Sequence, residues 1–131
     1  MIKTIDHIGI LTKSLQQSVE FYTDVLGFSI SRKIEMGEFS AVFIEKGGSK
    51  IELMGFKEVP KRSEGVELKI GSIPLDDHIS FLVDDIETTV TEFKDKGVVF
   101  ELEPIQLEGG TKIASFKDPN GVLIELVEHP E

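Results

Sequence analysis

The chain has 131 residues, a length typical of one domain with a sizeable core. Hydrophobic residues make up 40% and charged residues 29%, which excludes a disordered or fibrous protein. Fourteen Lys and Arg against 24 Asp and Glu give a formal net charge of −10. That charge argues against nucleic acid or an anionic membrane surface as a partner and favours a small molecule or a protein.

The chain contains no cysteine, so disulfides and a thiolate nucleophile are excluded. No apolar run approaches the roughly twenty residues that span a bilayer. The residues after Met1 do not form a charged and then apolar leader. We therefore expect a cytoplasmic protein that contacts no membrane.

The first half of the chain predicts one strand, one helix and three further strands. The opening strand is IDHIGIL, residues 5–11. A helix follows, because Ser14 with Gln17 resembles a capping box and Gly27 stands where a left-handed residue would end the helix. The three later strands are predicted at residues 28–34, 40–46 and 49–56.

The second half repeats this pattern at a constant offset, beginning with DDHISFLVDDIETTVTEF at residues 76–93. Asp84 or Asp85 can cap the second helix and Gly97 can end it. The apolar helix positions align between the copies as Leu15, Val19 and Tyr22 with Ile86, Val90 and Phe93. Strands are predicted at residues 98–105, 111–118 and 121–129.

The element order is therefore βαβββ, twice. We predict an α+β protein with a single domain of two tandem βαβββ modules that form a mixed sheet. The first module covers about residues 1–57 and the second about residues 76–131. The polar stretch between them, at about 58–75, is a predicted linker that could also cover a site.

Each module carries one histidine and one glutamate at matching places. His7 and His78 lie in the opening strands. Their side chains are on the sheet face opposite the apolar residues that would pack against the helices. Glu52 and Glu125 each stand at the centre of the tripeptide IEL, so the flanking apolar residues point the carboxylate away from the core. Imidazole nitrogens and carboxylate oxygens suit Zn²⁺, Ni²⁺, Co²⁺, Mn²⁺ or Fe²⁺. The four residues together predict a metal site with positions open for water or substrate.

Each of these residues also has a structural interpretation. A lone histidine at the start of a strand is more often a hydrogen-bonded structural residue, and a glutamate between apolar residues is usually solvated. The matching places in two repeats favour the metal site. We expect His129, in the tail, to be solvated, and Asp6 and Asp77 to point to the opposite face as capping or surface residues.

Three stretches of the chain resemble the vicinal oxygen chelate superfamily. They are DHIGI followed by SVEFYTDVLGF, DHISFLVDDIE followed by EFKDKGV, and FKDPNGVLIEL. This superfamily includes glyoxalase I (lactoylglutathione lyase), methylmalonyl-CoA epimerase, extradiol dioxygenases, fosfomycin-resistance enzymes and metal-free bleomycin-binding proteins. The resemblance covers essentially the whole chain and implies paired βαβββ modules whose sheets curve around a metal.

The ligand positions of the family fall on His7, Glu52, His78 and Glu125, which implies one divalent ion, Zn, Ni, Co or Mn. In the dioxygenase and fosfomycin branches, the resemblance implies a ligand set of two histidines and one glutamate, without a ligand at the position of Glu52. The bleomycin binders lack the metal ligands. A complete set therefore resembles the glyoxalase and epimerase branches.

Both branches move a proton on a carbon next to a carbonyl group. A divalent ion on the carbonyl oxygen stabilises the enediolate or enolate, and a nearby carboxylate transfers the proton. Glu125 is the first candidate for this base and Glu52 the second, because a glutamate can leave the metal or be held loosely by it. The resemblance thus implies a metal-dependent lyase or isomerase of the lactoylglutathione lyase type.

Two other functions stay open at this point. One is a methylmalonyl-CoA epimerase-like acyl-thioester epimerase, for which Glu35 and Glu38 are candidates for the further acidic base. The other is a non-enzymatic binding or resistance protein of the same fold. We expect a small-molecule substrate, a thiol adduct or an acyl thioester, and a homodimer. The candidate cations that would bind anionic groups of the substrate are Arg32, Lys61, Arg62 and Lys112.

Overall fold

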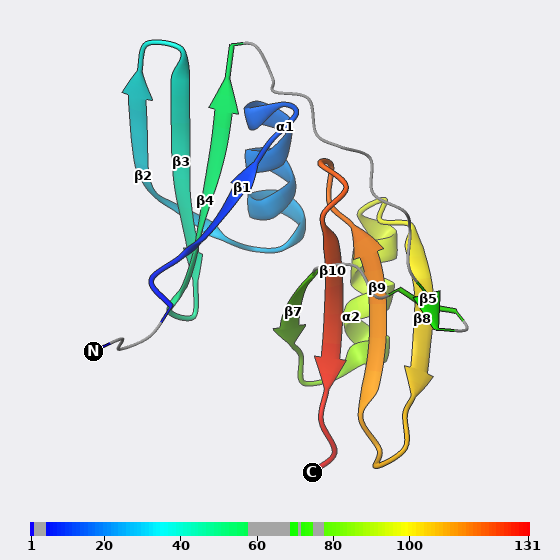
Figure 1. The fold of residues 1–131 in the computed structure, drawn as a ribbon. Coiled ribbons are helices and arrows are strands. Elements are labelled where there is room, and N and C mark those ends of the chain that lie inside the picture. Colours follow the sequence, from blue (N-terminus) through cyan, green and yellow to red (C-terminus); the bar gives the residue numbers. More distant parts are fainter. Residues whose placement is uncertain (2–4, 58–68, 71, 75–77) are drawn as a thin grey trace. The chain divides into compact units, whose positions relative to one another are not determined.

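The computed structural model describes residues 1, 5–57, 69–70, 72–74 and 78–131. The chain forms two compact units, Met1–Ser63 and Glu64–Glu131. Each unit contains its own four-stranded mixed sheet (Figure 1). The two tandem βαβββ modules predicted from the sequence repeat are therefore confirmed.

The first unit has one helical segment and four strands. Its elements are β1 (Ile8–Leu11), α1 (Leu15–Glu20), a π-helical turn η1 (Phe21–Val25), β2 (Ser29–Met36), β3 (Phe39–Lys46) and β4 (Ser49–Phe56). The strand order is β1-β4-β3-β2, with β1 parallel to β4 and the other pairs antiparallel. The first and last strands of the unit are thus neighbours.

The second unit repeats this topology. It contains β5 (Lys69–Ile70), β6 (Ile73–Pro74), β7 (His78–Leu82), α2 (Ile86–Asp95), β8 (Phe100–Gln106), β9 (Lys112–Lys117) and β10 (Leu123–Glu128). Its sheet has the order β7-β10-β9-β8, with β7 parallel to β10. In the part of the chain that the structure describes, the short strands β5 and β6 pair only with each other, and they fall within the predicted linker.

Both helices begin at the predicted caps, and Gly27 and Gly97 follow the two helical segments as predicted. The Ser14 side chain accepts a hydrogen bond from the Gln17 amide at 3.4 Å, and the Asp85 side chain accepts one from the Thr88 amide at 3.1 Å. These contacts satisfy amide groups that the first turn leaves without a partner. Gly27 has a positive φ of 79°, which a glycine adopts without strain. The π-helical turn after α1 was not predicted.

Burial fixes the faces of the last strand in each unit. Ile51 and Leu53 are at most 2% exposed, and so are Ile124 and Leu126. Fully burying each such side chain contributes about 1.5–3 kcal/mol. A slip of one residue would expose these side chains and bury the glutamate between them. The register of β4 and β10 is therefore strongly determined.

A buried aspartate shapes the turn between β9 and β10. Asp118 is 5% exposed, and its Oδ1 accepts hydrogen bonds from the amides of Asn120 and Val122, both at 2.8 Å. Gly121 in the same turn has a φ of +86°. The turn leads directly into β10.

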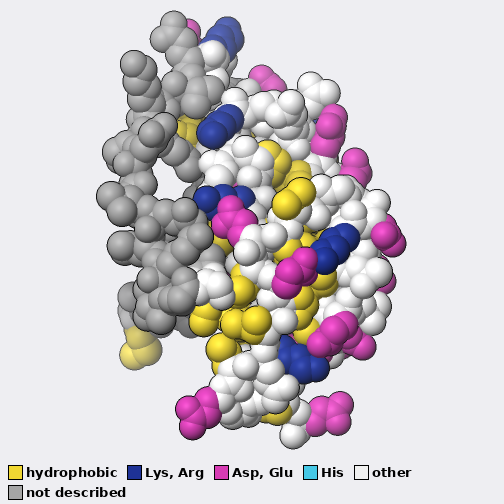
Figure 2. Space-filling model, turned by 90° about the vertical axis from the view of Figure 1, so that its right-hand side faces the viewer, with side chains coloured by type: hydrophobic (Ala, Val, Ile, Leu, Met, Phe, Trp, Pro, Cys, Tyr) yellow, Lys and Arg dark blue, Asp and Glu magenta, His cyan; other side chains and the backbone are white. Residues whose placement is uncertain are grey.

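Charged side chains are spread over the surface. On the face drawn in Figure 2, Lys and Arg side chains stand among Asp and Glu rather than gathering into one basic patch. The ion pairs Lys94–Glu103 and Lys117–Glu101 belong to this pattern of mixed charge. Among the described residues, no helix has both the length and the apolar character needed to cross a membrane.

Candidate metal centre

The first unit brings His7 and Glu52 together. His7 precedes β1 and Glu52 lies at the middle of β4, opposite Gly9 in the parallel pair. The His7 Nε2 atom is 3.8 Å from Glu52 Oε1. The imidazole also packs edge-to-face on Phe43, with ring centroids 5.3 Å apart. Phe43 is the other cross-strand neighbour of Glu52, so one aromatic ring supports the histidine beside the carboxylate.

Asp6 holds the other nitrogen of His7, contrary to the prediction that it points to the opposite face. Asp6 Oδ2 is 2.8 Å from His7 Nδ1. Because an ionised carboxylate can only accept, Nδ1–H is the donor, and Nε2 is the ring nitrogen that faces Glu52. Asp6 is a surface residue as predicted, with 84% of its side chain exposed, but its predicted direction was wrong because β1 begins only at Ile8, so strand alternation does not extend back to Asp6. Asp77 lies outside the described residues.

The hydrogen bond from His7, with the nearby charge of Lys50, holds the pKa of the Asp6 carboxyl below its ordinary value of 3.8. Asp6 therefore stays ionised at neutral pH, and protonation removes the contact only as the pH falls through that lowered pKa. A carboxylate on the outer nitrogen of a histidine fixes the tautomer and the ring orientation that a metal ion requires.

Replacement of Asp6 by alanine is expected to weaken the binding of a divalent ion by about 10- to 100-fold, the usual effect of losing such a partner. Competition titration with a chromophoric chelator at pH 7 measures the change. Asp95→Ala is the matched control, because it removes one negative charge from an exposed position at the end of α2. Equal affinity in Asp6→Ala and the control would show that Asp6 does not support a ligand.

The second unit brings His78 and Glu125 together in the same way. His78 is the first residue of β7 and Glu125 lies at the middle of β10. The distance from His78 Nε2 to Glu125 Oε1 is 4.0 Å. The Ser80 hydroxyl donates a hydrogen bond to the same Glu125 oxygen at 2.8 Å. Sequence reasoning gave Ser80 no role.

This second pair lies in an open groove of about 510 Å³ in the second unit. The groove has apolar walls, formed in part by Leu82 and Ile113, around the polar groups. His129 also lines it, although the sequence predicts only a solvated tail residue. His129 follows the end of β10, so strand alternation could not indicate its direction. His129 is itself exposed, so the groove offers a second accessible imidazole beside that of His78.

The geometry of both pairs fits a metal ion. Donor atoms that each lie about 2.0–2.2 Å from one ion can be at most about 4.4 Å apart. The Nε2 to Oε1 distances of 3.8 and 4.0 Å meet this limit. All four side chains are between 18% and 38% exposed, so an ion can reach them. The convergence of the two pairs on a single ion is a proposal, taken up below.

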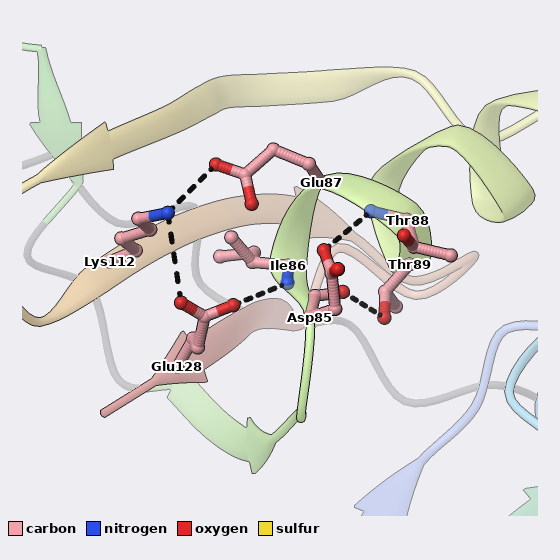
Figure 3. Close-up of polar contacts among 7 residues, drawn as sticks. All are labelled: Asp85, Ile86, Glu87, Thr88, Thr89, Lys112 and Glu128. Carbon is pink, nitrogen blue, oxygen red and sulfur yellow. Dashed lines mark hydrogen bonds and ion pairs between the residues drawn. The ribbon is translucent and has the colours of Figure 1, made fainter. Parts of the chain in front are cut away.

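A cluster of three carboxylates, Asp85, Glu87 and Glu128, lies at the start of α2 (Figure 3). The contacts of these carboxylates within the protein explain the cluster without a metal ion. Glu128 accepts a hydrogen bond from the Ile86 amide at 2.9 Å, while Asp85 caps the same helix. Lys112 lies 3.2 Å from Glu87 and 3.7 Å from Glu128. The hydrogen bond and charge of Glu87, and then the charge of Glu128, raise the pKa of Lys112. Lys112 thus compensates part of the charge of the cluster, and the hydrogen bond between Ile86 and Glu128 anchors the helix to β10.

The candidate acids of the epimerase alternative lie away from Glu52. Glu35 is opposite Ser40, which is opposite Gly55 on β4. Gly55 is three positions from Glu52, so alternation places Glu35 on the other face of the sheet. Glu35 and Glu38 line a separate hollow of about 350 Å³.

Two of the four candidate cations, Arg32 and Lys112, belong to the described residues. Of these two, only Arg32 lies on the same face of the sheet as Glu52. Its cross-strand neighbour is Phe43, which in turn neighbours Glu52. Lys112 is engaged in the acidic group just described. Lys61 and Arg62 lie outside the described residues.

Comparison with known proteins adds four findings. The model of the glyoxalase/bleomycin resistance protein/dioxygenase superfamily matches residues 4–126. A probable lactoylglutathione lyase of Vibrio cholerae serotype O1 is 34% identical over 132 residues, covering 95% of this chain and 90% of the relative. Human mitochondrial methylmalonyl-CoA epimerase is 29% identical, over 93% of this chain and 72% of the relative. Glyoxalase I from Zea mays superposes with a TM-score of 0.79 at 24% identity, over 97% of this chain and 45% of that one.

Proposed function

The chain belongs to the glyoxalase/bleomycin resistance protein/dioxygenase superfamily, and from this premise we propose that it is a metal-dependent glyoxalase-type enzyme. The family predicted from the sequence motifs is thereby confirmed. The proposed reaction is proton transfer next to the carbonyl of a small α-oxo compound or its thiol adduct. The observation that carries the proposal is the presence, in each unit, of a His–Glu pair whose donor atoms lie within 4.0 Å of each other.

We infer that His7, Glu52, His78 and Glu125 hold one divalent ion. Such an ion supplies Lewis acidity that polarises a substrate carbonyl. Glu125 takes the proton from the carbon that bears the thiol in the adduct and returns it to the carbonyl carbon. The hydroxyl proton passes to the former carbonyl oxygen, so the adduct is isomerised with no atom lost. The apolar walls of the groove, Leu82 and Ile113 among them, offer an apolar surface to that side of the substrate. Arg32 lies on the same face of the sheet as Glu52 and is the candidate cation for binding an anionic group of the thiol.

An acyl-thioester epimerase is the second candidate function. The 29% identity to the human methylmalonyl-CoA epimerase favours it. However, Glu35 and Glu38, which would have to supply the further acidic base, line a hollow that contains neither His7 nor Glu52. The glyoxalase-type reaction needs only the two His–Glu pairs, so it is the function that the geometry supports better. A binding protein of the same fold is the third candidate.

Metal content and substrate exchange test these functions in sequence. Protein purified without an affinity tag is expected to carry about one divalent transition ion per chain, as four nitrogen and oxygen ligands predict. Metal-loaded protein is then incubated in D₂O with methylglyoxal hemithioacetals and, separately, with acyl thioesters, and NMR follows the α-protons. Isomerisation of a hemithioacetal supports the proposal. Inversion of a thioester alone would identify an epimerase, and metal-loaded protein without any exchange would indicate a binding protein.

A further inference from the structure

The two glutamates occupy equivalent places but have different neighbours. In the first unit, the cross-strand neighbours of Glu52 are Gly9 and Phe43. Neither of these side chains can donate a hydrogen bond. A Cβ atom added to Gly9 would lie 3.7 Å from Glu52 Oε1, so the carboxylate extends along the glycine. The Glu52 carboxylate therefore receives no hydroxyl hydrogen bond from either neighbour.

In the second unit, the cross-strand neighbours of Glu125 are Ser80 and Ser115. Ser80 donates to Glu125 Oε1 at 2.8 Å, and this is the oxygen that lies 4.0 Å from His78 Nε2. The oxygen that faces the histidine is thus already engaged by a hydroxyl group.

Ser115 offers a second hydroxyl on the same side of the sheet. It is 3% exposed, and its Oγ has no hydrogen-bond partner among the described residues. Cross-strand neighbours on one face have Cβ atoms about 4.5–5.5 Å apart, which is within reach of a glutamate side chain. Glu125 thus stands between two serines where Glu52 stands between a glycine and a phenylalanine.

We propose that the Ser80 hydroxyl makes Glu125 the more loosely bound of the two glutamate ligands and so frees it to act as the base. This inference rests on the proposed function. The hydroxyl competes with an ion for the lone pairs of Oε1 and draws charge from the carboxylate, so it weakens the hold of the ion on that oxygen. Glu52, without such a donor, stays with the ion. Ser80 is a positioning residue, because it acts through Glu125.

Binding of Co²⁺ to the Ser80→Ala variant tests the proposal independently of activity. Co²⁺ is expected to bind about 3- to 10-fold more tightly, as loss of one competing hydrogen bond predicts. Its visible absorption is expected to weaken, because a firmly bound Glu125 raises the coordination number. With hemithioacetal substrate, kcat is expected to fall about 10-fold while KM changes little. Ser80→Thr keeps the hydroxyl and is expected to restore all three properties.

Two further variants make the test specific. Ser49→Ala removes an exposed hydroxyl at the start of β4 and is expected to match the wild type. Gly9→Ser places a hydroxyl beside Glu52, where the nearest obstacle is the flexible end of Met54 at 3.2 Å, and is expected to weaken Co²⁺ binding. Wild-type affinity, spectrum and kcat in Ser80→Ala would overturn the role of Ser80 alone. Wild-type protein that binds no Co²⁺ would overturn the proposed function as well.

Discussion

Replacing both histidines, in the His7→Ala, His78→Ala variant, is expected to lower the affinity for a divalent ion by at least about 10³-fold. The double replacement removes the nitrogen donor from both units and leaves only Glu52 and Glu125. Two carboxylates that are 18% and 22% exposed compete poorly with water for an ion such as Zn²⁺. Plasma mass spectrometry of the purified protein, followed by titration with Zn²⁺, measures the loss.

His129→Ala is the matched control for this experiment. It removes an imidazole from the same groove but none of the four proposed ligands. Its metal content is expected to equal that of the wild type. One ion per chain retained in the double variant would show that the two His–Glu pairs are not the metal site. Unfolding of the variants is monitored by circular dichroism, so that loss of metal is not confused with loss of fold.

The Glu125→Gln variant is expected to keep much of its metal while kcat falls by about 10²- to 10⁴-fold, the contribution of a general base. Glutamine has nearly the same shape and retains an oxygen that can face His78. It cannot accept the proton of the substrate. Steady-state kinetics with the hemithioacetal, together with the metal content of the same sample, separate these two effects.

Two glutamate variants serve as comparisons for Glu125→Gln. In Glu52→Gln, the larger effect is expected on the metal affinity, because Glu52 is the firmer ligand under the proposal. In Glu35→Gln, neither property is expected to change, since Glu35 lies on the other face of its sheet. Full activity of Glu125→Gln would remove Glu125 as the base, and inactivity of Glu35→Gln would favour the epimerase.

Local sequence signals were sufficient for most of the fold. Ser14 and Asp85 cap the helices because a short polar side chain before an apolar helical pattern competes well for the free amides. The strand predicted at residues 49–56 agrees with β4, where alternation and a Gly-Gly turn act together. The π-helical turn at Phe21–Val25 has no such signal. In this turn the Leu26 amide donates to the carbonyl of Phe21, five residues earlier, whereas in an α-helix the partner is four residues earlier.

The candidate site was only partly predictable. Alternation was enough to place His78 beside Glu125, because the two lie on neighbouring strands of one sheet. His7 lies just before β1, so strand alternation alone does not account for its place beside Glu52. Asp6 was missed, since the chain before Ile8 is not a strand. The sharing of one ion by both units, the homodimer and the cytoplasmic location stay predictions. Local pattern does not determine how folded units associate or where a protein resides.

The different neighbours of the two glutamates also bear on why the modules are joined in one chain. A site assembled from two copies of a single-module protein would place identical residues around both carboxylates. Any substitution made for one glutamate would then be imposed on the other. Within a tandem chain, position 9 can be glycine while position 80 is serine. Duplication in one chain thus allows a pseudosymmetric site to have an asymmetric division of labour.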